Sequence, residues 1–233
     1  MVHPWRASKI IYIIFFIFLD SAAFGKGINK LPTNQKVVSL TFDGCESIAP
    51  SYLDEKILSF LIDKKLPFTL FLSGKFAKRN KERISRISCL NFVEIENHSL
   101  NHIQHMERLS LKEIRKEVLE NERILKEITT KKTKYFRFPG GNYNEQTLKC
   151  VENLGYKVVY WTFPSGDPDR EVTPKRLKDW VLLKTKPGSI LIFHINGRGY
   201  ATGEALPEIV KELVRKDYTF IKLEGGLSDC GGR

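Results

Sequence analysis

The chain has 233 residues, of which 42% are hydrophobic and 28% charged, and its 38 Lys and Arg against 27 Asp and Glu give a formal net charge of +11. This composition excludes collagen-like, coiled-coil and wholly disordered chains, and the length suits a single domain. A positive charge alone identifies no partner, since nucleic acids, anionic membranes and acidic polymers all attract it.

The first 23 residues have the pattern of a secretory signal peptide. Arg6 and Lys9 precede ten uncharged, mostly apolar residues at 10–19, and the Ser-Ala-Ala at 21–23 offers small residues to a signal peptidase. Ten apolar residues are too few for a membrane span, which needs about 20. We therefore expect cleavage after Ala23, with an uncleaved N-terminal anchor as the alternative. The mature chain would be exported, to a periplasm or out of the cell, with a net charge of +10, no stable membrane span and no nucleic-acid partner.

All four cysteines lie in the predicted mature part: Cys45, Cys89, Cys150 and Cys230. An even number of cysteines in an exported protein allows up to two disulfides, in three possible pairings. The sequence does not choose among these pairings.

After a polar N-terminal leader at 24–35, short β-rich runs alternate with amphipathic segments. The expected strands are 37–42, 68–72, 92–95, 135–137, 158–161, 190–193 and 218–221. The expected helices are 52–62, 75–87, 111–128, 145–154, 174–183 and 204–215, and Ser110 and Glu113 have the spacing of a capping box. This alternation favours parallel β/α units. We expect one domain at 36–223 and a loose C-terminal tail at 224–233.

Polar side chains stand where the predicted strands end. In a parallel barrel the active site forms at the carboxyl ends of the strands, so residues in these places are expected to meet on one rim. The six candidates are Asp43, His98, His102, Arg137, Asp167 and His194.

His98 and His102 have the i, i+4 spacing that can put two imidazoles on one side of a helical turn. Two neutral imidazoles with a carboxylate make an open site for a divalent metal ion. The spacing alone is a weak signal, but the preceding strand and the carboxylate of Asp43 on another strand favour ligands over a surface pair. His105 continues the spacing and is interpreted as a bystander.

The other candidates each have a structural alternative. Asp43 could be a ligand, a general base or a cap of the next turn. Arg137 could be a surface or packing residue, or could hold a carboxylate ionised. His194 follows an apolar strand directly, so it is either a buried structural imidazole or a group that transfers protons near neutral pH.

Taken together and in this order, these positions resemble the polysaccharide deacetylase family, the carbohydrate esterases built on the NodB homology domain. The resemblance spans about 38–223 and rests on five ordered motifs. They are Thr41-Phe42-Asp43, Asn97 to His102, Arg137-Phe138-Pro139-Gly140-Gly141, the region of Asp167, and Ile192-Phe193-His194. The resemblance implies an α/β fold, a distorted parallel (β/α)7 barrel, and metal-dependent hydrolysis of N-acetyl groups on amino sugars.

The resemblance also implies a role for each residue. Asp43 would be the general base, oriented by Arg137, and His194 the general acid, tuned by Asp167. A divalent metal ion, with zinc expected, would be held by His98 and His102.

Two further positions would contact the substrate. The backbone N–H of Gly140 would donate to the oxyanion, and Ile192 would line the pocket for the acetyl methyl group. The substrate would be an N-acetylated polysaccharide of the envelope or the extracellular space, either peptidoglycan or a chitin-like chain. Trp161 and Trp180 could stack on sugar rings, although core positions are favoured for both. The oligomeric state stays open.

One departure from the family pattern concerns the metal. The family's opening motif carries two adjacent aspartates, the second a metal ligand, whereas Gly44 follows Asp43 here. Either Asp43 also reaches the metal, or Cys45 or Glu46 supplies a ligand, or water completes a two-histidine site. We favour Asp43. The alternative function is a catalytically impaired, carbohydrate-binding member of the same fold.

Overall fold

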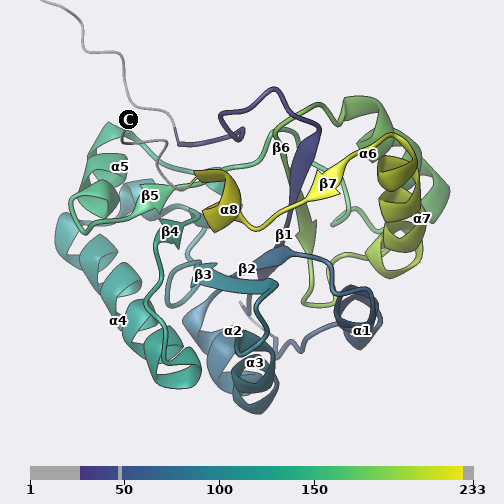
Figure 1. Cartoon of the computed structure of the whole chain (residues 1–233). Helices are drawn as coiled ribbons and strands as arrows, with labels where there is room; N and C mark the ends of the chain where they lie inside the picture. The colour runs from purple at the N-terminus through teal and green to yellow at the C-terminus, as the bar shows by residue number, and fades with distance from the viewer. Residues whose placement is uncertain (1–26, 47–48, 228–233) are drawn as a thin grey trace, which may run out of the picture.

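The computed structural model describes residues 27–46 and 49–227 (Figure 1). The predicted signal peptide and Cys230 lie outside the described residues. None of the helices in the described part combines the length and the apolar character that crossing a membrane requires. Cys45, Cys89 and Cys150 are free thiols.

In the part of the chain that the structure describes, seven parallel strands form one curled sheet, which confirms the predicted α/β barrel class. Along the sheet the strands follow the order β5-β4-β3-β2-β1-β6, and β7 pairs with the start of β1. Figure 1 shows the longer helices on the outside of this half-barrel. The strands are β1 (Val37–Gly44), β2 (Phe68–Leu72), β3 (Val93–Asn97), β4 (Tyr135–Phe136), β5 (Lys157–Val158), β6 (Ser189–His194) and β7 (Thr219–Phe220).

The longest strand, β1, is buried on both faces, as expected for a central parallel strand under helices. On the outer face, the Phe42 ring lies 6.1 Å from that of Phe68 and 5.7 Å from that of Phe193, centroid to centroid. Because side chains alternate along a strand, Thr41 and Asp43 point to the other face, the interior of the barrel. The apolar face thus fixes which polar side chains reach the interior.

Eight α-helices connect and cover the strands. They are α1 (Glu55–Asp63), α2 (Gly74–Arg79), α3 (Lys81–Ser88), α4 (Leu111–Thr129), α5 (Glu145–Glu152), α6 (Pro174–Lys184), α7 (Thr202–Arg215) and α8 (Leu223–Leu227) within the described residues. Two short 3₁₀ helices, η1 (Met106–Arg108) and η2 (Pro139–Gly141), follow β3 and β4. The capping box predicted at Ser110 and Glu113 is present at the start of α4.

The single helix predicted at 75–87 is wrong, because α2 and α3 are separated at Asn80. The Asn80 side chain accepts a hydrogen bond from Leu53 N at 3.0 Å and donates to the carbonyl oxygens of Phe76 at 2.9 Å and Ser51 at 3.2 Å. A residue that holds a neighbouring loop in this way favours a helix boundary over a helix interior.

Both segments that flank the predicted domain contribute to the barrel. In the leader, Leu31 is 1% exposed and its N–H donates to Gly188 O at 2.8 Å. In the tail, residues 224–227 belong to α8 and are not loose, since Glu94 Oε2 accepts from Leu223 N at 2.9 Å and Glu94 Oε1 from Glu224 N at 3.1 Å. Figure 1 shows α8 across the near end of the sheet.

Candidate active site

The register of the sheet places the polar residues at the carboxyl ends of neighbouring strands side by side. Asp43 on β1 pairs with His194 on β6. On the other side, Asn97 on β3 pairs with Phe136 on β4, so that the residues after them, His98 and Arg137, follow side by side. The structure therefore brings all six rim residues of the sequence analysis to the same end of the barrel.

A cavity of about 390 Å³ opens at this end. Of the predicted site residues it is lined by Asp43, His102, Gly140, Asp167, Ile192 and His194. His98 and Arg137 are not in its lining and are almost completely buried. The six rim residues are thus divided into a layer that faces the cavity and a layer that supports it.

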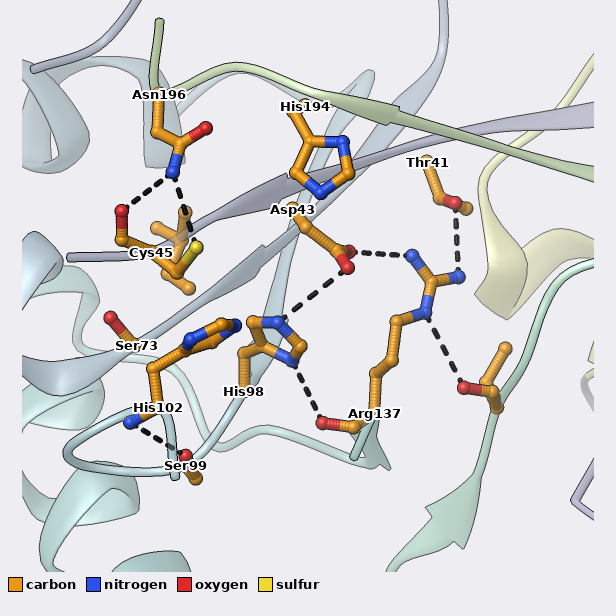
Figure 2. A network of polar contacts seen from close by, with 12 residues as sticks. Thr41, Asp43, Cys45, Ser73, His98, Ser99, His102, Arg137, His194 and Asn196 are labelled. Carbon is orange, nitrogen blue, oxygen red and sulfur yellow. Dashed lines mark hydrogen bonds and ion pairs between the residues drawn. The ribbon is translucent and has the colours of Figure 1, made fainter. Parts of the chain in front are cut away.

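Arg137 is the centre of the supporting layer, with 0% of its surface exposed. Its Nη1 donates to Asp43 Oδ1 at 2.7 Å and its Nη2 to Thr41 Oγ1 at 3.0 Å (Figure 2). The same Nη2 also donates to Tyr160 O at 3.0 Å. The guanidinium carbon lies 4.0 Å from the centre of the Phe71 ring. Arg137 is therefore a fixed, ion-paired side chain and neither a surface residue nor a purely apolar packing residue.

The carboxylate of Asp43 is ionised despite its burial. Burial alone would raise the pKa of Asp43, but the positive charge of Arg137 and its hydrogen bond to the carboxylate outweigh the effect of burial and hold this pKa below its ordinary value. One oxygen of Asp43 is bound by Arg137, and the other, Oδ2, lies 3.5 Å from His98 Nε2.

The tautomer of His98 follows from its hydrogen bond to the backbone. Its Nδ1 donates to the carbonyl oxygen of Arg137 at 2.8 Å, so Nε2 carries the lone pair of the neutral ring. Burial is the main reason that the pKa of His98 is lowered, which favours the neutral ring. The lone pair of Nε2 then faces a carboxylate oxygen, an arrangement that a cation bound to both atoms would stabilise.

His98 and His102 are brought together by a turn rather than by the predicted helical turn. Ser99 and His102 have φ angles of 66° and 55°, in the left-handed region, and the Ser99 hydroxyl accepts a hydrogen bond from His102 N at 3.1 Å. The two imidazole centroids lie 4.9 Å apart. Burial and the neighbouring His98 lower the pKa of His102 to about 3, so His102 is also neutral.

A buried amide network that the sequence analysis missed holds this turn. Asn97 Oδ1 accepts from Ser99 N at 3.0 Å and from Asn121 Nδ2 at 2.8 Å, and Asn97 Nδ2 donates to Val118 O at 3.0 Å. Asn121 also donates to Leu72 O at 2.9 Å, which connects α4 to the end of β2. The available sequence signal was Asn121, a polar residue among the mostly apolar positions on the buried face of α4.

The second catalytic candidate, His194, is held by Asp167. The ring Nδ1 of His194 donates to Asp167 Oδ1 at 2.9 Å, and its backbone N–H donates to Oδ2 at 2.7 Å. Ser165 and Thr202 hydroxyls donate to the same carboxylate at 3.0 and 2.9 Å. Burial lowers the pKa of His194, but Asp167 outweighs it, so that the net shift is upward. His194 thus keeps its proton to a higher pH than an ordinary histidine.

Two of the alternative metal ligands considered from the sequence are engaged elsewhere. Burial and Asp43 raise the pKa of the Cys45 thiol to about 12, and Asn196 Nδ2 donates to its sulfur at 3.1 Å. Glu46 forms an ion pair with Arg79, whose Nη2 lies 2.9 Å from Glu46 Oε1. A neutral thiol and a carboxylate bound to arginine are both poor metal donors.

Of the candidate donors, this leaves His98, His102 and Asp43, two neutral imidazoles and an ionised carboxylate. These donors fit a divalent ion in their chemistry. Their side chains are not already arranged as a metal site. Within 27–46 and 49–227, no three His, Cys, Asp or Glu side chains are grouped closely enough to hold a metal ion. The family's second carboxylate would come from position 44, where Gly44 has no side chain.

The cavity also contains residues that the sequence analysis did not assign to the site. Gln104, Trp161 and Arg198 line it together with the predicted residues. Gly140 has a φ of 62° and Ile192 is nearly buried in the cavity wall. Arg198 lies in the glycine-containing loop after His194, and this loop was the only sequence signal for it.

Comparisons with known proteins agree with this geometry. The sequence model of the family described as polysaccharide deacetylase matches residues 30–159. A peptidoglycan-N-acetylglucosamine deacetylase of Bacillus cereus is 28% identical over 195 residues, which make up 82% of this chain and 88% of that protein. The peptidoglycan-N-acetylmuramic acid deacetylase PdaA of Bacillus subtilis is 30% identical over 196 residues, 82% of this chain and 72% of that protein.

The solved structures include both enzymes and a protein described as inactive. PdaA, described as a family 4 carbohydrate esterase, superposes with a TM-score of 0.75 over 87% of this chain and 85% of its own, at 27% identity. BA3943 of Bacillus anthracis, described as a CE4 family pseudoenzyme, has a TM-score of 0.72 over 83% of this chain and 66% of its own, at 26% identity. By sequence and by fold, the chain belongs to the polysaccharide deacetylase family, whose enzymes are hydrolases of carbon–nitrogen bonds other than peptide bonds.

Proposed function

We propose that this protein is an exported, metal-dependent deacetylase that hydrolyses N-acetyl groups of amino sugars in an envelope or extracellular glycan, either peptidoglycan or a chitin-like chain. The observation that carries the proposal is the pair of polar contacts, Asp43 with Arg137 and His194 with Asp167, at neighbouring strand ends beside one cavity. The apolar run at 10–19 after Arg6 and Lys9 supports export.

Asp43 acts as the general base of the reaction. Its pKa is below the ordinary value, so it is ionised at neutral pH, and Arg137 fixes one oxygen at 2.7 Å. A base held in one orientation can accept a proton from the attacking water. Arg137 contributes by positioning the carboxylate and by stabilising its charge in the buried site.

His194 acts as the general acid. Asp167 binds its Nδ1, which leaves Nε2 to donate a proton to the amine as it departs. The raised pKa of His194 keeps that proton available at neutral pH. A base with a lowered pKa and an acid with a raised one, on paired positions of β1 and β6, are what hydrolysis of an amide needs.

A divalent ion, zinc in our proposal, would be held by His98, His102 and Asp43, and when bound would supply Lewis acidity to the acetamide carbonyl. Gly140 lines the same cavity, and its backbone N–H would donate to the oxyanion. Ile192 offers an apolar wall for the acetyl methyl group.

The test is acetate release by the purified mature chain from peptidoglycan and from N-acetylglucosamine oligomers, with zinc or cobalt supplied, together with the metal content of the protein. We expect acetate release by the wild type and almost none by Asp43→Asn. No bound metal and no acetate from either substrate would overturn the proposal. A His98→Ala variant with full activity would overturn the metal assignment alone.

A second candidate is a glycan-binding protein with impaired catalysis. Gly44 in place of a ligand and the absence of a closed three-ligand group among the described residues favour it. The likeness to a protein described as a pseudoenzyme supports it further. This candidate predicts binding of the same oligomers without acetate release, whatever metal is supplied.

A further inference from the structure

A second and larger cavity, of about 670 Å³, lies next to the active-site cavity. Pro164, Ser165, Gly166 and Asp169 line both cavities, so the loop between β5 and α6 is a wall that the two share. The remainder of the larger cavity is formed by the end of this loop and by α6. A ligand that extends from the catalytic residues across this loop would reach α6.

The wall formed by α6 presents a fixed aromatic side chain to solvent. Trp180, for which a core position was favoured, is 39% exposed. Its indole N–H donates to Pro164 O at 2.9 Å, and Lys184 Nζ lies 4.7 Å from the ring centre. The hydrogen bond ties the ring to the loop that both cavities share. Because Trp180 is held before any ligand arrives, little conformational freedom is lost when one binds.

The rest of the lining matches a ligand with apolar faces and polar edges. Leu183, 73% exposed, extends the apolar surface beside Trp180. The rim carries both signs of charge, from Lys175 and Arg176 on one hand and Asp179 on the other. A mixed rim does not select a polyanion or a polycation. Sugar rings have apolar faces that pack on aromatic rings and hydroxyl edges that hydrogen-bond to charged and polar groups.

We propose that this cavity is a distal subsite for the glycan, in which Trp180 stacks against a sugar of a β-linked, N-acetylated amino-sugar chain whose reacting residue lies beside Asp43 and His194. The inference rests on the proposed function, because it takes the substrate of the catalytic cavity to be a chain. It predicts selectivity for chain length, since only a longer chain would occupy both cavities.

The experiment compares chitobiose with chitohexaose by isothermal titration calorimetry on the full mature chain. A chelator is present, so that turnover does not interfere. We expect the wild type to bind the hexamer more tightly than the dimer, and Trp180→Ala to weaken hexamer binding by about three- to tenfold while leaving dimer binding unchanged. Trp180→Phe keeps an aromatic face and should recover most of the loss.

Leu119→Ala is the matched control, since Leu119 is 46% exposed on α4, away from both cavities. Equal loss of hexamer binding in Leu119→Ala and Trp180→Ala, or hexamer binding by Trp180→Ala equal to that of the wild type, would overturn the subsite. Acetate release from both oligomers is measured separately with zinc. Length-dependent binding that depends on Trp180, without acetate release, would support the subsite and overturn the proposed deacetylase activity. Acetate release with no effect of Trp180→Ala on hexamer binding would support the activity and overturn the subsite.

Discussion

At the scale of single residues, the site contains two pairs in which one side chain stabilises the charge of the other, Arg137 with Asp43 and Asp167 with His194. Arg137 and Asp43 are buried together, and Asp167 binds both the ring and the backbone of His194. A buried ion pair adds little net stability over an apolar pair, but removal of one partner leaves an uncompensated charge. Substitutions at these positions therefore affect stability and protonation as well as catalysis.

Arg137→Met is expected to lower the free energy of unfolding by roughly 3–5 kcal/mol, because the Asp43 carboxylate would stay buried without its partner. The destabilisation should shrink as the pH falls, since protonation of Asp43 removes the charge. Urea unfolding at several pH values measures this. Arg123→Met, at an exposed position on α4, is the control and should stay near the wild type. A pH-independent loss would contradict the ion-pair explanation.

Asp167→Asn is expected to lower the pKa of His194, because the carboxylate that stabilises the imidazolium is lost while the shape of the side chain is kept. NMR titration of the His194 ring measures this without any turnover. The basic limb of the pH profile of kcat/KM should move to lower pH by the same amount, since His194 must be protonated in its proposed role as general acid. Asp169 lines the same cavity without a contact to His194, so Asp169→Asn should change neither the pKa of His194 nor the basic limb of the pH profile.

Gly44→Asp tests whether the missing carboxylate explains the incomplete donor set. A Cβ at this position would lie 2.7 Å from Leu72 Cδ2 and 2.8 Å from Phe76 Cε1, so we expect a loss of roughly 1–3 kcal/mol of stability from overpacking. Gly44→Ala has the same steric cost without the carboxylate. Zinc affinity, measured by calorimetry, should rise in the aspartate variant alone. Equal zinc affinity in both variants would show that position 44 does not limit metal binding.

At the scale of elements, the last two residues of β3 make two separate connections. Its last residue, Asn97, holds the histidine turn, while Glu96 accepts the N–H groups of Lys134 at 2.8 Å and Tyr135 at 2.7 Å at the start of β4. Burial and the neighbouring Glu94 raise the pKa of Glu96 well above its ordinary value. The connection from β3 to β4 is therefore made by a carboxyl group that resists ionisation.

Glu96→Gln is expected to remove a pH-dependent weakness of the fold. Since the pKa of Glu96 is higher in the folded than in the unfolded chain, wild-type stability falls as pH rises above the unfolded value. The glutamine oxygen can still accept both N–H groups. The difference in unfolding free energy between variant and wild type should therefore grow from pH 5 to pH 8, by at most about 1.4 kcal/mol per pH unit. Glu120→Gln, exposed on α4, should show no such growth.

The elements that could be predicted from the sequence are those with a strong periodic pattern. The apolar runs of β1, β2 and β6 and the amphipathic pattern with its capping box in α4 placed these elements. Parallel topology then required Asp43, His98, Arg137 and His194 to share one end, and the structure brings them there. The roles of these residues stay predictions.

What could not be predicted depends on contacts between distant segments. The break at Asn80 arises from hydrogen bonds to the loop before α1, and the exposure of Trp180 arises from a bond to Pro164. Neither partner can be read from local spacing. The left-handed turn at Ser99 and His102 likewise depends on Asn97 and on α4 behind it.

At the scale of the whole molecule, the N-terminal segment connects β5 to the start of β6, beside the direct pairing of Phe163 with Leu191 on β6. Ile28 N donates to Val158 O at 2.8 Å, Tyr160 N donates to Ile28 O at 2.7 Å, and Leu31 N donates to Gly188 O at 2.8 Å. Residues 28–31 therefore lie between the segment after β5, where the Tyr160 carbonyl accepts from Arg137, and β6, which ends at His194. The same segment remains in the chain after the predicted cleavage.

A chain that begins at Lys36 should consequently be less stable and less active than one that begins at Gly27, although both retain every predicted site residue. Loss of residues 27–35 exposes backbone at the edges of β5 and β6 and the apolar surface that Leu31 covers. It also frees the Tyr160 backbone, whose carbonyl oxygen accepts from Arg137. Urea unfolding should give a lower midpoint, and amide hydrogen exchange should accelerate at Val159 and Tyr160 more than in β2. If exchange rises equally throughout the sheet, the segment stabilises the fold generally. Selective exchange at the two edges would instead identify residues 28–31 as the closure of the barrel around the site.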